Sequence, residues 1–259
     1  TPASEGRSIL GSGGYARLSE GVDVCLMDAG ALGPRWNPGH GHADFLAIEL
    51  TLGGRRVIVD PGTSRYNSGS DRARERSAAA HNGPVWSGYE PVEFLNCFKV
   101  GRMAEARLIA VEDLPPLTIG GVLRSGPGVI SRSVRRFPGE GFLIVDAWSA
   151  ASPRGRTSWL LPDDWRIKAD GAIFSLRHAS GGRAVIQCLS GIVPASPQRS
   201  RCATHYGSTG PAWSLALQPS STTNSQHLVC WIGHDAAPSE AAAEGQALLC
   251  LLDTAFATA

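Results

Sequence analysis

The residues best suited to chemistry are three histidines and two aspartates that follow one another within a short stretch of the chain. They are His40, His42, Asp44, Asp60 and His81. Two histidines at positions i and i+2 project to the same side of an extended chain, so both imidazoles can reach one centre. Neutral imidazole and carboxylate are good zinc ligands, and two histidines with one aspartate leave a fourth tetrahedral position for water or substrate. The spacing alone leaves two interpretations open, a metal site and solvated histidines beside a turn.

The hairpin expected after His42 restricts whether His42 and Asp60 could bind the same metal ion. Two strand-like runs flank Gly53 and Gly54, a dipeptide suited to a tight turn with positive φ. In a regular hairpin Asp60 would lie opposite Ala47 rather than His42, and five residues of strand span roughly 16–17 Å. A shared metal therefore requires the chain to bend after His42; without that bend the metal interpretation is wrong.

Composition and periodicity predict an all-β protein. The 259 residues include 31 Gly and 17 Pro, which indicates many turns and argues against a helical bundle. Apolar or alternating runs of strand length are Val22–Met27, Phe45–Leu52, Arg55–Asp60, Phe142–Ala147, Ala184–Leu189, Leu228–Ile232 and Ala247–Leu252. Only residues 71–80 and 239–245 are typical of short helices. We therefore expect a single domain over residues 1–259, a two-sheet antiparallel β-sandwich with little helix.

Charge, hydropathy and cysteine usage argue against several classes of function. The chain has 24 Lys+Arg and 23 Asp+Glu, a net charge of +1 that is unfavourable for a dedicated nucleic-acid binder. No apolar run approaches the roughly 18 residues that a membrane span needs, so no membrane span is predicted. The six cysteines form no Cys-x-x-Cys pair, which favours small buried side chains over metal ligands. Because the first residues carry neither an initiator Met nor a signal segment, we expect a processed or excised part of a longer protein.

Longer segments around the histidines resemble a known family. The segments are GHGHADFLAIELTLGGRRVIVDPGTSRYN at residues 39–67, RERSAAAHN at 74–82 and GRMAEARL at 101–108. They resemble the C-terminal β-sandwich domain of the heparinase II/III-like polysaccharide lyases. A weaker similarity around His205-Tyr206-Gly207 and residues 215–217 extends the resemblance to residues 13–233. The resemblance implies a supersandwich-like fold.

The resemblance also implies a metal site. In the family a metal, usually zinc, is held by the second His of the His-x-His pair, the Asp of the turn after an apolar strand, and the His of the AAHN-like segment. Those positions are His42, Asp60 and His81 here. The implied cofactor is therefore Zn²⁺, in a structural or site-organising role.

Three further positions are implied to face the substrate. His40 matches a residue that faces the substrate cleft, where an imidazole could neutralise a uronate carboxylate or assist proton transfer near neutral pH. The alternative is that His40 supports the metal loop. Tyr66 and Arg76 are implied to contact substrate, since an arginine is a natural partner for a carboxylate. The alternative for Arg76 is an ion-pair residue that positions His81.

The activity that the resemblance implies is β-elimination on uronate-containing polysaccharides. A base removes the proton at C5, an acid protonates the leaving oxygen, and the carboxylate must be neutralised for the proton to leave. In the family a helical α/α-toroid domain before the sandwich supplies the principal catalytic tyrosine, and this chain has no such domain. We therefore expect the C-terminal half of a two-domain lyase, with an acidic polysaccharide as substrate and the toroid domain as partner. The isolated chain is expected to be inactive.

Two hypotheses from other classes remain. One is a non-catalytic sandwich module that binds carbohydrate or serves a structural role. The other, less favoured, is an autonomous zinc hydrolase, because His-x-His-x-Asp also opens the site of metallo-β-lactamase-like hydrolases. In that fold another histidine usually follows the aspartate, whereas Phe45 follows Asp44 here. The family resemblance further allows a homodimer, and we expect a periplasmic or secreted location for the parent protein.

Overall fold

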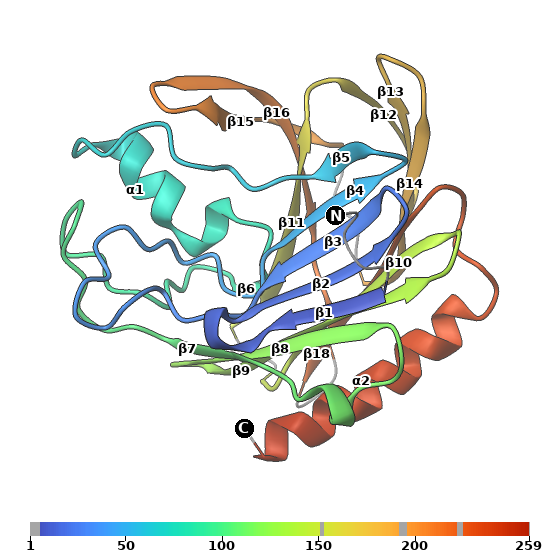
Figure 1. Ribbon diagram of the computed structural model, residues 1–259, viewed down its shortest axis with the longest axis horizontal. Coiled ribbons are helices and arrows are strands. Elements are labelled where there is room, and N and C mark those ends of the chain that lie inside the picture. Colours follow the sequence, from blue (N-terminus) through green and yellow to red (C-terminus); the bar gives the residue numbers. More distant parts are fainter. Residues whose placement is uncertain (1–5, 151–152, 192–195, 222–224, 259) are drawn as a thin grey trace.

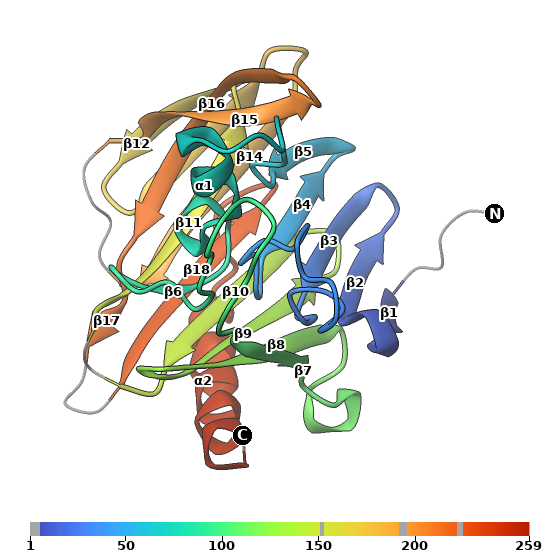
Figure 2. The ribbon, with the colours of Figure 1, turned by 90° about the vertical axis from the view of Figure 1, so that its left-hand side faces the viewer.

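The computed structural model describes residues 6–150, 153–191, 196–221 and 225–258, and its strands form two antiparallel layers (Figures 1 and 2). Within these residues the first layer begins with a five-stranded sheet in the order β1-β2-β3-β4-β5. These strands are β1 Gly6–Leu10, β2 Tyr15–Glu20, β3 Asp23–Asp28, β4 Ile48–Leu52 and β5 Arg55–Ile58. The predicted all-β sandwich is confirmed.

A second, four-stranded sheet joins the first at the end of β5. Its described strands, in the order β15-β16-β11-β6, are β15 Gln198–His205, β16 Ser208–Leu217, β11 Gly155–Pro162 and β6 Val85–Trp86. The backbone N–H of Val59, just after β5, donates to the carbonyl of Leu160 in β11 at 2.9 Å. The segment that carries Asp60 therefore leaves one sheet and runs along the edge of the other.

The opposite layer is a nine-stranded sheet, counted over the described residues. Its order is β12-β13-β14-β18-β10-β9-β8-β7, with β17 paired to β18. The strands are β7 Glu105–Leu108, β8 Thr118–Ser125, β9 Gly128–Phe137, β10 Gly141–Trp148, β12 Trp165–Asp170, β13 Ile173–His178, β14 Arg183–Ser190, β17 Ser220–Ser221 and β18 Gln226–Gly233. Apolar side chains from both layers, including Leu18, Met27, Ile144 and Trp159, form the core between them.

The helical segments differ from the prediction at the C-terminal end. The described helices are α1 Ser70–Arg76 and α2 Ala241–Thr258, with short 3-10 turns at Gly11–Gly13, Ala78–Ala80 and Val111–Asp113. The predicted strand at 247–252 is wrong, because this run belongs to α2, which packs Leu248 and Leu252 against Leu143 and Trp231 on the outer face of the large sheet (Figure 2). A short apolar run does not distinguish a strand from a buried helix segment. None of the described helices has the length and apolar character to cross a membrane.

The predicted hairpin forms, and the chain before it bends. Gly53 and Gly54 have φ values of 56° and 73°, as a primed turn requires. Before β4, the N–H of Ala47 bonds the carbonyl of Asp44 at 2.9 Å, and Leu46 adopts φ 58°, a rare value for a residue other than glycine. This turn meets the requirement for a bend after His42.

Candidate functional site

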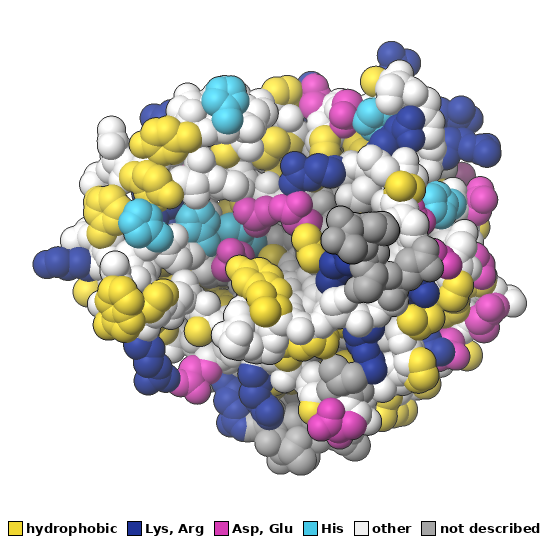
Figure 3. Space-filling view, viewed as in Figure 1, with side chains coloured by type: hydrophobic (Ala, Val, Ile, Leu, Met, Phe, Trp, Pro, Cys, Tyr) yellow, Lys and Arg dark blue, Asp and Glu magenta, His cyan; other side chains and the backbone are white. Residues whose placement is uncertain are grey.

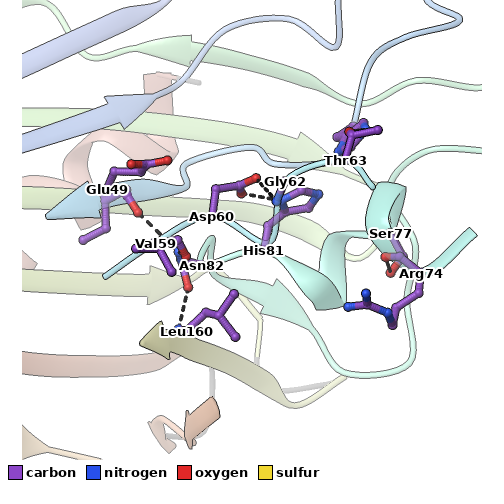
Figure 4. A network of polar contacts seen from close by, with 12 residues as sticks. Glu49, Val59, Asp60, Gly62, Thr63, Arg74, Ser77, His81, Asn82 and Leu160 are labelled. Carbon is purple, nitrogen blue, oxygen red and sulfur yellow. Dashed lines mark hydrogen bonds and ion pairs between the residues drawn. The ribbon is translucent and has the colours of Figure 1, made fainter. Parts of the chain in front are cut away.

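The bend brings the second histidine of the pair, the aspartate after β5 and the histidine after α1 to one place. Nδ1 of His81 lies 2.7 Å from Oδ1 of Asp60, and Figure 4 shows the two side chains pointing toward each other. The other carboxylate oxygen of Asp60 accepts the N–H of Gly62 at 2.9 Å. The imidazole rings of His42 and His81 have their centroids 5.4 Å apart. Three segments that are distant in sequence thus form one polar cluster.

His42 is held as a neutral imidazole. Nη1 of Arg72 lies 2.9 Å from Nε2 of His42, and the hydroxyl of Thr63 lies 3.1 Å from the same nitrogen. A guanidinium group only donates hydrogen bonds, so Nε2 must be the unprotonated acceptor. Burial and the nearby charges of His81 and Arg72 lower the pKa of His42 to about 3.

Carboxylates surround the buried His81. Burial opposes the charged forms of His81 and Asp60, but their hydrogen bond and mutual attraction raise the pKa of His81 and lower that of Asp60. Burial, reinforced by the charges of Asp28 and Asp60, raises the pKa of Asp44 to about 6. The charge of Asp28 and then burial raise the pKa of Tyr15 to about 12. The cluster therefore concentrates negative charge beside one buried imidazole.

Asn82, directly after His81, fixes this cluster to strands β4 and β11 and to the residue that follows β5. Its side-chain NH₂ donates to the carbonyls of Val59 and Ile48, and its carbonyl oxygen accepts the N–H of Leu160 at 2.8 Å (Figure 4). Asn82 is fully buried. Because these backbone groups have no access to water, the amide supplies partners that the strands lack at this junction. The position of His81 follows from this anchor.

A buried ion pair holds both the turn after Asp44 and the loop that carries His81. Arg132 on β9 makes a bidentate contact with Asp146 on β10, at 2.7 and 2.8 Å. Its Nη1 donates to the carbonyls of Leu46 and Asn82, at 2.8 and 2.7 Å. The strained turn after Asp44 and the loop with His81 therefore share one guanidinium anchor.

His40 lies among aromatic rings rather than in the His42 cluster. It is exposed, and its ring centroid lies 5.0 Å from that of Tyr66 and 5.7 Å from that of Phe98, both in edge-on contacts. Tyr206, on the β15–β16 hairpin, lies 5.6 Å from Tyr66. Figure 3 shows histidine side chains in a row beside hydrophobic ones on the α1 side of this face, with acidic side chains near the middle. The surface thus combines an exposed imidazole with aromatic rings.

A family model for the heparinase II/III-like C-terminal domain matches residues 3–226. The chain belongs to this family. No curated protein sequence matches it significantly. The family places the two-layer sandwich and the segments quoted from residues 39–82 in one known domain type.

Solved structures share the fold of this heparinase II/III-like domain. Heparan sulfate lyase HepC from Pedobacter heparinus superposes with a TM-score of 0.72 at 17% identity, over 92% of this chain and 38% of that chain. A structure of heparinase III gives a TM-score of 0.71 at 16% identity, over 91% of this chain and 38% of that chain. The chain thus spans little more than a third of the length of these relatives, and the similarity shows the fold alone.

The heparinase II/III-like domain offers suitable ligand types for a metal ion, but holds them in other contacts. Within the described ranges, no three His, Cys, Asp or Glu side chains are arranged as a ligand set. His42 is bound by Arg72 and Thr63, and Asp60 by His81. A backbone hydrogen bond with Glu75 also acts on the His81 imidazole and helps to raise its pKa. Imidazole nitrogens and a carboxylate are ligand types that zinc accepts, so the chemistry of these three side chains fits zinc once His81 has lost its proton.

Arg76, which the resemblance implies to contact substrate, is held by backbone carbonyls of two loops. Its Nε donates to the carbonyl of Gly41 at 3.0 Å, and its Nη1 to the carbonyls of Asn96 and Cys97, at 3.0 and 2.9 Å. The side chain is buried and stacks over Phe94 at 4.2 Å. Arg76 thus joins the His-x-His loop to the 94–97 loop.

Sequence reasoning missed Arg72, which links the two halves of the site. It bonds His42, and its guanidinium carbon lies 4.9 Å from the ring centroid of Tyr66, as in a cation–π contact. The residue is almost fully buried. Nothing in its residue type or spacing distinguishes it from the neighbouring arginines of α1, so only the three-dimensional structure identifies it.

Proposed function

We propose that this heparinase II/III-like domain forms one wall of the cleft of a polysaccharide lyase, which cleaves uronate-containing glycans by β-elimination. The observation that carries the proposal is the exposed His40 imidazole, which is in ring contact with Tyr66 and lies apart from the cluster of half-buried His42 and buried His81. Aromatic rings beside a titratable group suit a sugar that carries an acid. The family membership and the heparan sulfate lyase fold of the relatives support it.

The chemistry assigned to His40 is charge neutralisation at the uronate. In β-elimination the C5–H bond breaks, a C4–C5 double bond forms, and the C4–O bond to the leaving sugar breaks as that oxygen takes up a proton. The dianion that develops on the carboxylate dominates the barrier, so a preorganised positive or hydrogen-bonding group lowers it. The His40 imidazole supplies that group, and Tyr66 orients the sugar beside it.

We further propose that zinc binds at His42, Asp60 and His81. Bound zinc would fix the loop that carries His40 and stabilise the folded state by mass action. The convergence of these three side chains from separate segments supports this assignment. Because Arg72 now occupies Nε2 of His42, zinc binding would also release that guanidinium.

The proposal includes a second domain that closes the cleft. The relatives with the same fold are much longer than this chain, and a single exposed surface does not enclose a polymeric substrate. We propose that a helical domain in the parent protein provides the opposite wall and the remaining catalytic groups. The acidic polysaccharide would then bind between the two.

The test measures the reaction class of the full-length protein. Incubation with uronate-containing polysaccharides should produce unsaturated uronate ends, which absorb in the ultraviolet and carry no added water in mass spectrometry. Products with one added water would instead identify a hydrolase. Glycan binding without any cleavage would support a carbohydrate-binding module, and either result would refute the lyase proposal.

A further inference from the structure

A cavity of about 240 Å³ lies between α1 and the 94–97 loop. Two arginines of α1, Arg72 and Arg76, line it together with Ser68, Asn96 and Cys97. Ser68 and Asn96 are exposed, so one rim of the cavity is formed by surface loops. Arg72 and Arg76 are each only 1% exposed. A space large enough for a small charged group therefore borders two buried cations.

Several guanidinium donors beside this cavity have no partner. Nε and Nη2 of Arg72, and Nη2 of Arg76, are buried without a hydrogen-bond acceptor among the described residues. Nη1 of Arg72 donates to His42, and Nε and Nη1 of Arg76 donate to backbone carbonyls. A buried donor without a partner costs roughly 1–3 kcal/mol, so three in one place need an explanation.

The two charges are only partly compensated: the charge of Glu75 opposes the effect of burial on the pKa of Arg72, but burial still lowers that pKa. Neither arginine forms an ion pair with a carboxylate in the described part of the chain; Glu75, between them in sequence, bonds Ser64 and Arg74 instead. Burial, followed by repulsion from Arg72, lowers the pKa of Arg76 to about 10. Buried charge that has no close ion-pair partner is unfavourable. An acceptor that carries negative charge would relieve both the charge and the unpaired donors.

We propose that this cavity binds an oxyanion of the acidic glycan, a carboxylate or a sulfate ester, through Arg72 and Arg76. Guanidinium groups present planar pairs of donors that match the oxygens of both anions. Arg72 lies against Tyr66, which contacts His40, so a sugar anchored here extends toward the surface proposed for catalysis. The inference deepens the proposed function, on which it rests for the identity of the ligand.

The alkylation rate of Cys97 can report anion binding in the cavity without any measurement of catalysis. Cys97 lines the cavity and forms a 3.4 Å contact with Ser68 across the rim, whereas Cys250 on α2 is exposed elsewhere. Mass spectrometry follows the rate at which Cys97 and Cys250 are alkylated in the full-length protein. The rates in sodium sulfate are compared with those in sodium chloride at equal ionic strength. At ten times the dissociation constant, mass action predicts that sulfate slows alkylation of Cys97 by about tenfold. The Cys250 rate should not change.

Matched variants assign the protection to the arginine pair. Arg72→Gln should abolish the effect of sulfate on Cys97. Arg74→Gln removes the same charge from the same helix but lies outside this cavity, so it should preserve the effect. Arg72→Lys keeps the charge and removes the paired donors, so protection should weaken. Unchanged alkylation of Cys97 in wild-type protein at saturating sulfate would refute the site, whatever the variants do.

The source of the anion is tested with oligosaccharides of equal length. One carries uronate and sulfate groups, and the other is neutral. The proposal predicts that the charged oligosaccharide protects Cys97 and that the neutral one does not. Protection by inorganic sulfate but not by the charged oligosaccharide would refute the glycan as ligand. The lyase function and the anion site can be refuted separately. Protection of Cys97 without unsaturated product refutes the lyase function, and unsaturated product without protection of Cys97 refutes the anion site.

Discussion

The anchor beside His81 should be a large source of stability, and Asn82→Ala removes it. The substitution leaves the N–H of Leu160 and the carbonyl of Val59 buried without their partners. Each orphaned group costs roughly 1–3 kcal/mol, and the longer contact to Ile48 adds little. We therefore expect the free energy of unfolding to fall by about 3–5 kcal/mol, at the upper end of single substitutions.

Urea denaturation of the full-length protein, followed by tryptophan fluorescence, measures this loss. Asn96→Ala is the matched control, because the Asn96 side chain also accepts backbone hydrogen bonds, from Phe98 and Lys99, but in an exposed turn where water can replace it. The control should lose less than about 1 kcal/mol. If both variants lose the same small amount, burial is not what makes the Asn82 bonds valuable, and the account of this anchor is wrong.

Three further predictions concern charge and metal. Arg132→Met should destabilise by about 3–5 kcal/mol, because it leaves Asp146 buried and unpaired; adding Asp146→Leu should restore part of the loss in urea titrations. Burial raises the pKa of Glu90 to about 7, so the ionised carboxylate lowers stability as the pH rises from about 4.5 through 7. Glu90→Gln should therefore raise the free energy of unfolding at pH 8 by at most about 3 kcal/mol, and the melting temperature with it, and should change neither at pH 4. His42→Ala should lose zinc and thermal stability together, whereas His40→Ala should keep both; equal zinc contents by elemental analysis would contradict the assignment.

The strand pattern and the turn chemistry could be predicted from the sequence. In β4 the alternation of Ile48, Leu50 and Leu52 with polar residues matches buried and half-buried positions, and the Gly-Gly turn forms as predicted. The α2 segment could not, since a six-residue apolar run such as 247–252 is too short to show its period. Its helical spacing becomes clear only when the whole length of α2 is known.

The candidate site was predictable in part. The spacing of the histidines left a metal site and solvated loop histidines both open; the family resemblance implied His42, Asp60 and His81 as one set, and the structure brings these side chains together. The anchors were not predictable, because Asn82 acts through backbone groups of three distant segments and Arg132 through a loop on the opposite layer. Such contacts depend on how the layers meet, and no local pattern in the chain encodes that.

The most direct test of the central claim compares wild type with His40→Ala in the full-length protein. The assay follows the rate of unsaturated product from a uronate polysaccharide, together with glycan affinity and melting temperature. His227→Ala, on β18 of the opposite layer, serves as the matched control. We expect His40→Ala to lower the rate by about 100-fold or more, as for loss of a group that stabilises the transition state, and to leave the melting temperature unchanged. A rate within twofold of wild type would contradict the proposed role of His40.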